Sequence, residues 1–155
     1  MEIILENGFT FYLIPSDDEE KLRSLNCGLI HMEEASGISE SIYTQLLTRM
    51  RDHATQDKLI IVCSNPSLGW IKDVFYDNIA RANPKHPEHE NYNPNITTYI
   101  WKSYQNPYLP KDFIDNISKG KPDWWKKRYI DGSFEQVEGA VYPRFSETII
   151  KSQHI

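Results

Sequence analysis

The feature that most constrains the fold is the apolar run Leu59–Cys63, which stops at Ser64-Asn65-Pro66. A short run without polar alternation predicts a central strand of a parallel sheet, because both faces of such a strand are buried. A second run, Leu29–Met32, stops at Glu33-Glu34 and predicts another buried strand. Between the two runs, Ser39–Asp52 has a capping serine and apolar residues at four-residue spacing, which predicts a helix. Strand, helix and strand in this order predict an α/β fold with a parallel sheet and a right-handed crossover.

The rest of the chain predicts a hairpin, further helices and two more strands. Asn7-Gly8 lies between two β-prone runs, which is a strong hairpin signal because both residues tolerate positive φ. A helix after Gly69 should place apolar side chains as far as Ile79 on its inner side. The remaining expected elements are a helical turn within 19–25, a surface loop at 83–95, a strand at 97–101, helices near 111–118 and over 123–129, and a strand within 135–142.

Charge is unevenly distributed along the 155 residues, whose net charge is −5. Residues 1–60 carry 5 basic and 11 acidic side chains, whereas residues 61–155 carry 12 and 11. This balance argues against a surface that coats nucleic acid indiscriminately, and any contact with a polyanion should come from the second half. Cys27 and Cys63 each lie in an apolar run and are expected to be small buried hydrophobes in a reducing compartment. No apolar run has the length of a membrane helix, and no secretory signal is recognisable, so we expect a cytoplasmic protein without a membrane partner.

Two strand ends carry side chains that suit phosphate chemistry. Glu33-Glu34 after an apolar strand has the Walker B arrangement, in which one carboxylate holds Mg²⁺ and the next orients and deprotonates water. Ser64 and Asn65 offer a hydroxyl and an amide that can bond a γ-phosphate. Each feature alone more often means an exposed strand exit or a turn. Together, on strands joined by one helix, they favour a nucleotide site at the carboxyl edge of the sheet.

The segment 119–129 is basic and rich in aromatic residues, and it includes Lys126, Lys127 and Arg128. Such a segment can track a DNA backbone. The alternative is a helix that buries one of its tryptophans together with Tyr129 and leaves its lysines in water.

Arg49 and Arg51 are expected at the end of the first long helix, where cations favour the helix dipole. The alternative is that these arginines reach the nucleotide of a neighbouring subunit. His86 and His89 are too few ligands for a zinc site in a loop. A nuclease that would combine them with the two glutamates also lacks a third carboxylate.

The order of these features resembles the large terminase subunit of tailed bacteriophages and prophages. The similar segments follow the hairpin and are Lys21–Leu25, Leu29–Ala35, Leu47–Arg51, Ile61–Pro66, Asn106–Pro110, Lys127–Gly132 and Glu138–Phe145. That family is a DNA-packaging motor with an N-terminal ATPase domain and a C-terminal RNase H-like nuclease domain. The resemblance implies a partial P-loop NTPase sheet of RecA-like (ASCE) type, with an N-terminal hairpin and a small helical linker subdomain after it.

The resemblance also implies roles for residues and regions. Glu33 matches the metal-associated acid, Glu34 the catalytic carboxylate, and Ser64 and Asn65 the motif that couples hydrolysis to movement. Residues 1–82 would be the second half of the ATPase domain, 83–95 a loop, 96–135 the end of the ATPase region with the linker subdomain, and 136–155 the lead-in to the nuclease. The implied cofactors are ATP and Mg²⁺. The implied partners are the remaining terminase segments, the small terminase subunit, the portal protein and double-stranded DNA in the bacterial cytoplasm.

Two features of that family are absent from the sequence. It contains no Gly-x-x-x-x-Gly-Lys-[Ser/Thr] loop, and no nuclease acids follow the lead-in segment. We therefore expect an internal segment of a terminase that is inactive by itself and binds neither ATP nor Mg²⁺ tightly. The competing expectation is a non-catalytic interaction or assembly module, or a remnant of a prophage gene without function.

Overall fold

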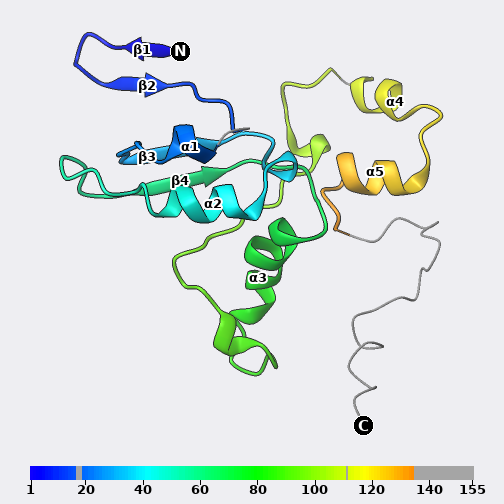
Figure 1. Ribbon diagram of the computed structural model, residues 1–155. Helices are drawn as coiled ribbons and strands as arrows, with labels where there is room; N and C mark the ends of the chain where they lie inside the picture. Colours follow the sequence, from blue (N-terminus) through cyan, green and yellow to red (C-terminus); the bar gives the residue numbers. More distant parts are fainter. Residues whose placement is uncertain (17–18, 111, 135–155) are drawn as a thin grey trace. The chain divides into compact units, whose positions relative to one another are not determined.

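The computed structural model describes residues 1–16, 19–110 and 112–134. The chain divides into two compact units, one that ends at Asn65 and one that begins at Pro66 (Figure 1). The first unit contains β1 (Glu2–Ile4), β2 (Thr10–Tyr12), α1 (Glu19–Leu22), β3 (Leu29–Met32), a 3₁₀ turn η1 (Ala35–Gly37), α2 (Glu40–Leu47) and β4 (Leu59–Val62). The second contains η2 (Lys72–Tyr76), α3 (Asp77–Arg81), η3 (His89–Asn91), η4 (Ser103–Gln105), α4 (Phe113–Ser118) and α5 (Asp123–Tyr129).

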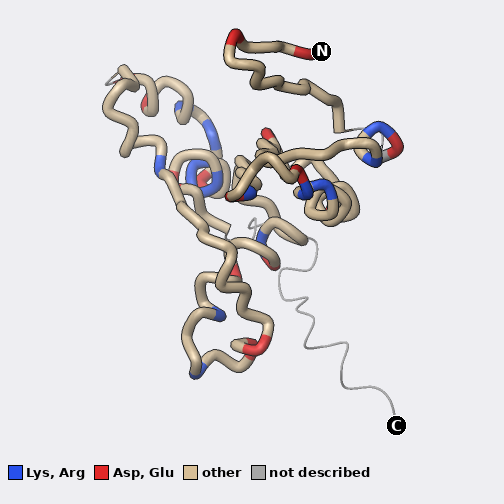
Figure 2. The backbone as a smooth tube through the Cα atoms, turned by 90° about the vertical axis from the view of Figure 1, so that its left-hand side faces the viewer, with Lys and Arg blue, Asp and Glu red and all other residues tan. Residues whose placement is uncertain are grey.

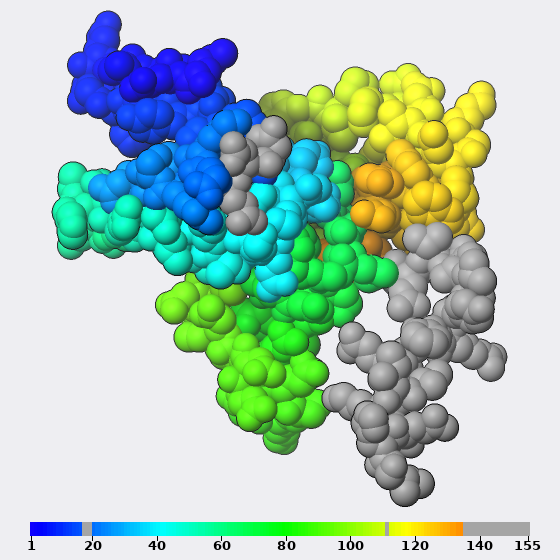
Figure 3. All heavy atoms as spheres, in the orientation of Figure 1, coloured from blue at the N-terminus to red at the C-terminus, as the bar shows by residue number. Residues whose placement is uncertain are grey.

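The N-terminal hairpin is confirmed. β1 and β2 pair antiparallel, with Ile3 opposite Phe11. Gly8 has a φ of 83°, a conformation that costs glycine little, and the Asn7 side chain accepts a hydrogen bond of 3.0 Å from the amide of Phe9. Most hairpin residues are exposed, and the hairpin (dark blue) protrudes from the rest of its unit in Figure 3. The hairpin is therefore held mainly by its own turn and strand pairing.

The parallel pair predicted from the two apolar runs is also confirmed. β3 and β4 pair parallel in one unbroken register, from Leu29 opposite Leu59 to Met32 opposite Val62. The predicted crossover helix is α2, and its first residue follows Ser39. The strand–helix–strand order brings the carboxyl ends of both strands to one edge, where ligands bind in open α/β sheets.

The burial of these strands differs from the expectation for a central strand. Ile30 and Met32 are buried, together with Ile42, Tyr43 and Leu46 of α2. On the other face, Leu29, Leu59 and Ile61 are 44%, 51% and 40% exposed. Along β3 and β4 one face is thus buried or half-buried and the other is exposed. The apolar run therefore behaves as an alternating strand, and the prediction of two covered faces is wrong for this structure.

Helix α2 ends at Leu47, five residues before the predicted end near Asp52. The Thr48 hydroxyl donates to the Gln45 carbonyl at 2.7 Å, and the amides of Thr48 and Arg49 bond carbonyls three residues earlier. Such short-range bonds satisfy the last carbonyls of a helix and close it. Arg49 and Arg51 thus lie beyond the helix and not in its last turn.

The helix predicted after Gly69 forms, but its inner face differs from the prediction. Its middle is the π-helical segment η2, where Lys72 pairs with Asp77 at 2.6 Å, a five-residue separation that suits a π turn. The wider turn changes the phase of the residues that follow it. Ile79 is consequently 48% exposed, whereas Asn78 is only 4% exposed. The Asn78 side chain donates to the Asn93 carbonyl at 3.0 Å and accepts from the Asn93 amide at 2.8 Å.

The strand predicted at 97–101 is wrong, because these residues have no regular structure. Thr98 is held by a hydrogen bond from its hydroxyl to the Phe75 carbonyl at 2.9 Å, and the described residues offer no strand to pair with it. Helices α4 and α5 confirm the two helices predicted near 111–118 and over 123–129. The strand expected within 135–142 lies outside the described residues. Among the described helices, none has both the length and the apolar character that a bilayer crossing requires.

Candidate functional site

The carboxyl edge of the β3–β4 pair is the candidate site. The Cys63 amide donates to the Met32 carbonyl at 2.9 Å, and the Cys63 carbonyl accepts from the Ala35 amide at 3.0 Å. These two bonds lie on either side of Glu33 and Glu34, so the parallel pairing continues past the ends of both strands. The backbones that carry the two glutamates and Ser64-Asn65 are therefore fixed to each other, as the sequence predicts.

Glu34 and Asn65 are brought together at this edge. The Asn65 amide donates to Oε2 of Glu34 at 3.4 Å. Glu34 adopts the left-handed region, with φ 51° and ψ 44°, and is the only non-glycine residue of the described chain with positive φ. A left-handed backbone disfavours a residue with a Cβ, and such strain is concentrated at functional sites. The prediction that these two side chains lie within about two strand spacings, roughly 10 Å, is confirmed.

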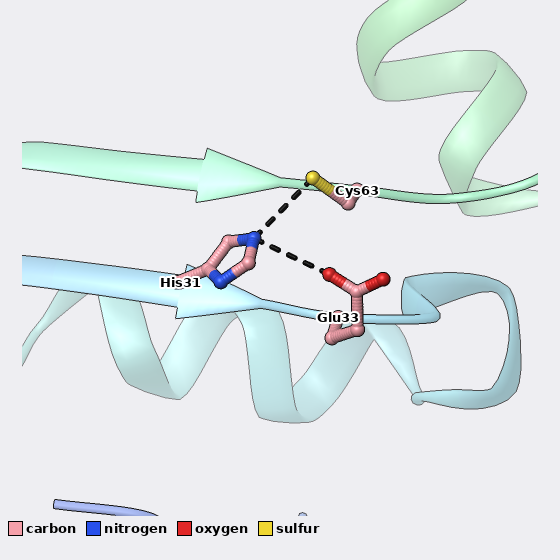
Figure 4. Close-up of side chains that lie close together, drawn as sticks. All are labelled: His31, Glu33 and Cys63. Carbon is pink, nitrogen blue, oxygen red and sulfur yellow. Dashed lines mark hydrogen bonds and ion pairs between the residues drawn. The ribbon is translucent and has the colours of Figure 1, made fainter. Parts of the chain in front are cut away.

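Glu33 has different partners, which sequence reasoning missed. Its Oε2 lies 3.3 Å from Nε2 of His31, and the same nitrogen lies 3.3 Å from Sγ of Cys63 (Figure 4). Cys63 is half-buried, not fully buried as expected. The signal that would have found this cluster is the two-residue period of a strand, which places His31, Glu33 and Cys63 on one face once the register is known.

The other predicted residues of the first unit have local partners. The Ser64 hydroxyl donates to the Asn65 carbonyl at 2.8 Å. Arg49 donates from Nε to the Thr48 hydroxyl at 3.0 Å and from Nη1 to the Arg23 carbonyl at 2.6 Å. Arg51 is exposed. In this structure Arg49 thus stabilises the end of α2, and a role in trans would require it to leave these contacts.

At the opposite, amino end of the strand pair, the turn before β4 is built on Asp52. Its carboxylate accepts from the Thr55 hydroxyl and from the Ala54 amide. These bonds lower the pKa of Asp52 below its ordinary value. Burial raises the pKa of the Cys27 thiol, and the charge of Asp52 raises it further, so Cys27 is held as a neutral thiol.

The predicted basic segment forms α5 in the second unit. Lys126, Lys127 and Arg128 occupy its last turn, and Figure 2 shows where basic and acidic residues lie along the backbone. The Arg128 guanidinium lies 5.5 Å from the centre of the Tyr129 ring, and its buried Nε has no hydrogen-bond partner in the described structure. Lys127 is exposed, whereas Lys126 and Arg128 are half-buried. Of the aromatic residues in this helix Trp125 is half-buried, whereas Tyr129, which the alternative expected to be buried, is 39% exposed.

His86 and His89 do not converge on a common ligand position. Nδ1 of His89 lies 2.7 Å from the Arg81 carbonyl, and Nδ1 of His86 accepts from the Glu88 amide at 3.2 Å. Both rings instead make hydrogen bonds to backbone groups of α3 and of the loop that follows it.

Comparison with known proteins identifies the family. The family model described as phage terminase large subunit matches residues 1–132. The chain belongs to this family. No curated protein matches it. Among solved structures, one of the large terminase from the thermophilic bacteriophage D6E has a TM-score of 0.66 and 21% identity, over 95% of this chain and 34% of that one. A structure of the same large terminase in complex with ADP has a TM-score of 0.64 and 20% identity, over 90% of this chain and 31% of that one.

These likenesses confirm the fold class. The α/β fold of this chain is similar to that of a phage large terminase. This chain spans about a third of that protein's length. The roles of individual site residues and the boundaries at 82, 95 and 135 stay predictions.

Proposed function

We propose that this chain is part of the ATP-driven motor that packages viral DNA into phage procapsids, and that it supplies the catalytic carboxylate edge of the ATPase sheet. The observation that carries the proposal is the pair Glu34–Asn65 at the carboxyl ends of two parallel strands, in a chain of the terminase large subunit family. The structural neighbour solved in complex with ADP supports nucleotide as the ligand of this fold.

The side chains at this edge supply some of the contacts that a hydrated Mg²⁺ and a phosphate chain require. Carboxylate oxygens are ligands that Mg²⁺ prefers, and the Asn65 amide can donate to a phosphate oxygen. When bound, Mg²⁺ would neutralise phosphate charge. Glu34 would orient and deprotonate the attacking water, with its carboxylate positioned by Asn65. Glu33 would hold the metal, for which its oxygen must leave His31. The loop that cradles phosphates is absent from the sequence, so those contacts must come from other polypeptide.

We also assign roles in sensing phosphate, in reaching a neighbouring subunit and in contacting DNA. Ser64 and Asn65 would sense the γ-phosphate, because Asn65 contacts the carboxylate nearest the reacting water. Arg49 and Arg51 would reach the nucleotide of a neighbouring subunit. In the second unit, Lys126, Lys127 and Arg128 would contact DNA or a neighbouring subunit, since a cationic helix end suits phosphate.

The proposed partners are the remaining terminase segments, the small terminase subunit, the portal protein and double-stranded DNA, in the cytoplasm of the bacterial host. Within this assembly we assign residues 1–82 to the second half of the ATPase domain. Residues 96–135 would complete the ATPase region and link it, through 136–155, to the nuclease region.

The test is packaging in a strain that encodes the chain and produces particles. Glu34→Gln removes the base but keeps the hydrogen-bonding shape, and DNA protected from nuclease inside particles should fall to background. Asp57→Asn is the matched control, because Asp57 is an exposed carboxylate at the amino end of β4, at the opposite end of the same sheet. Wild-type packaging by Glu34→Gln, or after deletion of the gene, would refute the proposal and favour a remnant without function.

A further inference from the structure

We propose that His31, Glu33 and Cys63 form a Zn²⁺ site on the open face of the β3–β4 pair. An imidazole nitrogen, a carboxylate oxygen and a thiol sulfur all lie within 4.8 Å of one another (Figure 4). These are the three ligand types that zinc takes in proteins. The inference concerns metal binding and does not rest on the proposed packaging function.

The spacing of the ligand atoms suits tetrahedral zinc. Zinc bonds of about 2.1 Å to nitrogen or oxygen and about 2.3 Å to sulfur imply tetrahedral separations of roughly 3.4 Å for nitrogen to oxygen and roughly 3.6 Å for nitrogen to sulfur. The observed separations are 3.3 Å from His31 Nε2 to Glu33 Oε2 and 3.3 Å from His31 Nε2 to Cys63 Sγ. Small side-chain rotations would therefore admit the ion.

The backbone that carries these ligands is already fixed. His31 is paired with Ile61 in the sheet register, and Glu33 and Cys63 each follow two residues later on the same face. The Cys63 amide and carbonyl are both bonded to the neighbouring chain segment, at 2.9 and 3.0 Å. Ligands on paired strands lose little freedom when they bind a metal, which favours a preformed site.

The chemistry of the set selects zinc over magnesium. Thiolate and imidazole ligands suit Zn²⁺, whereas Mg²⁺ prefers oxygen ligands alone. Three protein ligands on an exposed face leave a fourth position for water. Because Glu33 is one of the three, zinc at this cluster would occupy the carboxylate that we assign to Mg²⁺ in packaging.

The test is metal binding by the full chain, with Co²⁺ as the spectroscopic probe and Zn²⁺ as the competitor. One equivalent of Co²⁺ should give the near-ultraviolet charge-transfer band of a thiolate ligand and the visible bands of a tetrahedral site. One equivalent of Zn²⁺ should abolish both, whereas a large excess of Mg²⁺ should not. Zinc affinity is then measured by calorimetry.

Each ligand variant has a distinct expected result. Cys63→Ser should remove the charge-transfer band, while His31→Asn and Glu33→Gln should retain it weakly. In all three, zinc affinity should fall by more than the roughly 10–100-fold that loss of an outer-shell partner costs. Cys27→Ser is the matched control, because Cys27 is the other free cysteine and lies outside the cluster, and its band should equal that of the wild type.

Circular dichroism is used to check that each variant is folded. His31 and Glu33 are exposed, so their substitution should change the free energy of unfolding little. The proposal is overturned if zinc does not bind in a 1:1 ratio, if Mg²⁺ displaces cobalt, or if the band survives Cys63→Ser and disappears in Cys27→Ser.

Discussion

The left-handed backbone of Glu34 predicts an inverted response to glycine. At an ordinary position glycine is less stable than alanine, because it loses more backbone freedom on folding. At Glu34, where φ is 51°, glycine also escapes the steric conflict that any Cβ meets. We therefore expect Glu34→Gly to be more stable than Glu34→Ala, whereas Glu33→Gly should be less stable than Glu33→Ala.

The magnitude follows from comparing the two positions. The left-handed conformation costs a residue with a Cβ about 1–2 kcal/mol. Glycine costs about 0.4–1 kcal/mol relative to alanine through the unfolded chain, and this contribution is common to both positions. The contacts of Glu34 with Asn65 and of Glu33 with His31 are lost in the alanine and glycine variants alike. The alanine-to-glycine change should thus differ between the two positions by about 1–2 kcal/mol, the cost of the left-handed backbone alone.

The assay is urea denaturation followed by far-ultraviolet circular dichroism, because all four tryptophans lie after Asn65 and would report the second unit. Equal slopes with urea across the four variants allow midpoints to be compared as free energies of unfolding. If glycine is less stable than alanine at both positions by the same amount, the strain assigned to Glu34 does not exist.

Three further outcomes are expected. Gly28→Ala should destabilise the chain by about 1–3 kcal/mol, since the added Cβ would lie 2.5 Å from Cβ of Thr55, and Thr55→Gly in the same chain should recover part of the loss on urea denaturation. The pKa of Asp52 is lowered on folding, so its stabilising contribution is present at neutral pH and is lost as pH falls below about 4; the difference in stability between wild type and Asp52→Asn should shrink there, and an unchanged difference would contradict this assignment. The 155-residue chain alone should show no Mg²⁺-dependent ATP hydrolysis in a phosphate-release assay, because no phosphate-cradling loop is present in the sequence, and turnover abolished by Glu34→Gln would refute this.

The parts of the fold that could be predicted from sequence are those with strong local signals. Asn7-Gly8 determines the hairpin turn, and the polar residues after each apolar run mark the ends of β3 and β4. The end of α2 was missed because a threonine hydroxyl closes the helix, although the apolar spacing continues to Met50. The strand predicted at 97–101 does not form, because β-propensity describes a residue's fit to a sheet, and the described chain offers no neighbouring strand for these residues.

The sequence predicted only those contacts of the candidate site that follow from the parallel order of the two strands. Once β3 and β4 are parallel, Glu34 and Asn65 must meet at one edge. The cluster at His31 requires the register as well, because a one-residue slip would turn Cys63 to the opposite face. The π turn before Asn78 could not be predicted from the spacing of apolar residues. One extra residue in a turn rotates all later side chains around the helix axis, so the inner face inferred from a regular α-helix is wrong after that turn.

Asn65 is both the hydrogen-bond partner of Glu34 and the last residue of the first unit. Pro66 follows directly, so the ring fixes the next φ and restricts Asn65 itself to extended backbone. Two residues earlier, the Cys63 amide and carbonyl are both hydrogen-bonded to the segment that carries Glu34. A rotation about the N–Cα bond of Asn65 would move its side-chain amide away from Glu34. The hydrogen bond to the Glu34 carboxylate is therefore made by a residue whose backbone the following proline restricts, so replacing Pro66 would loosen the position of the Asn65 amide.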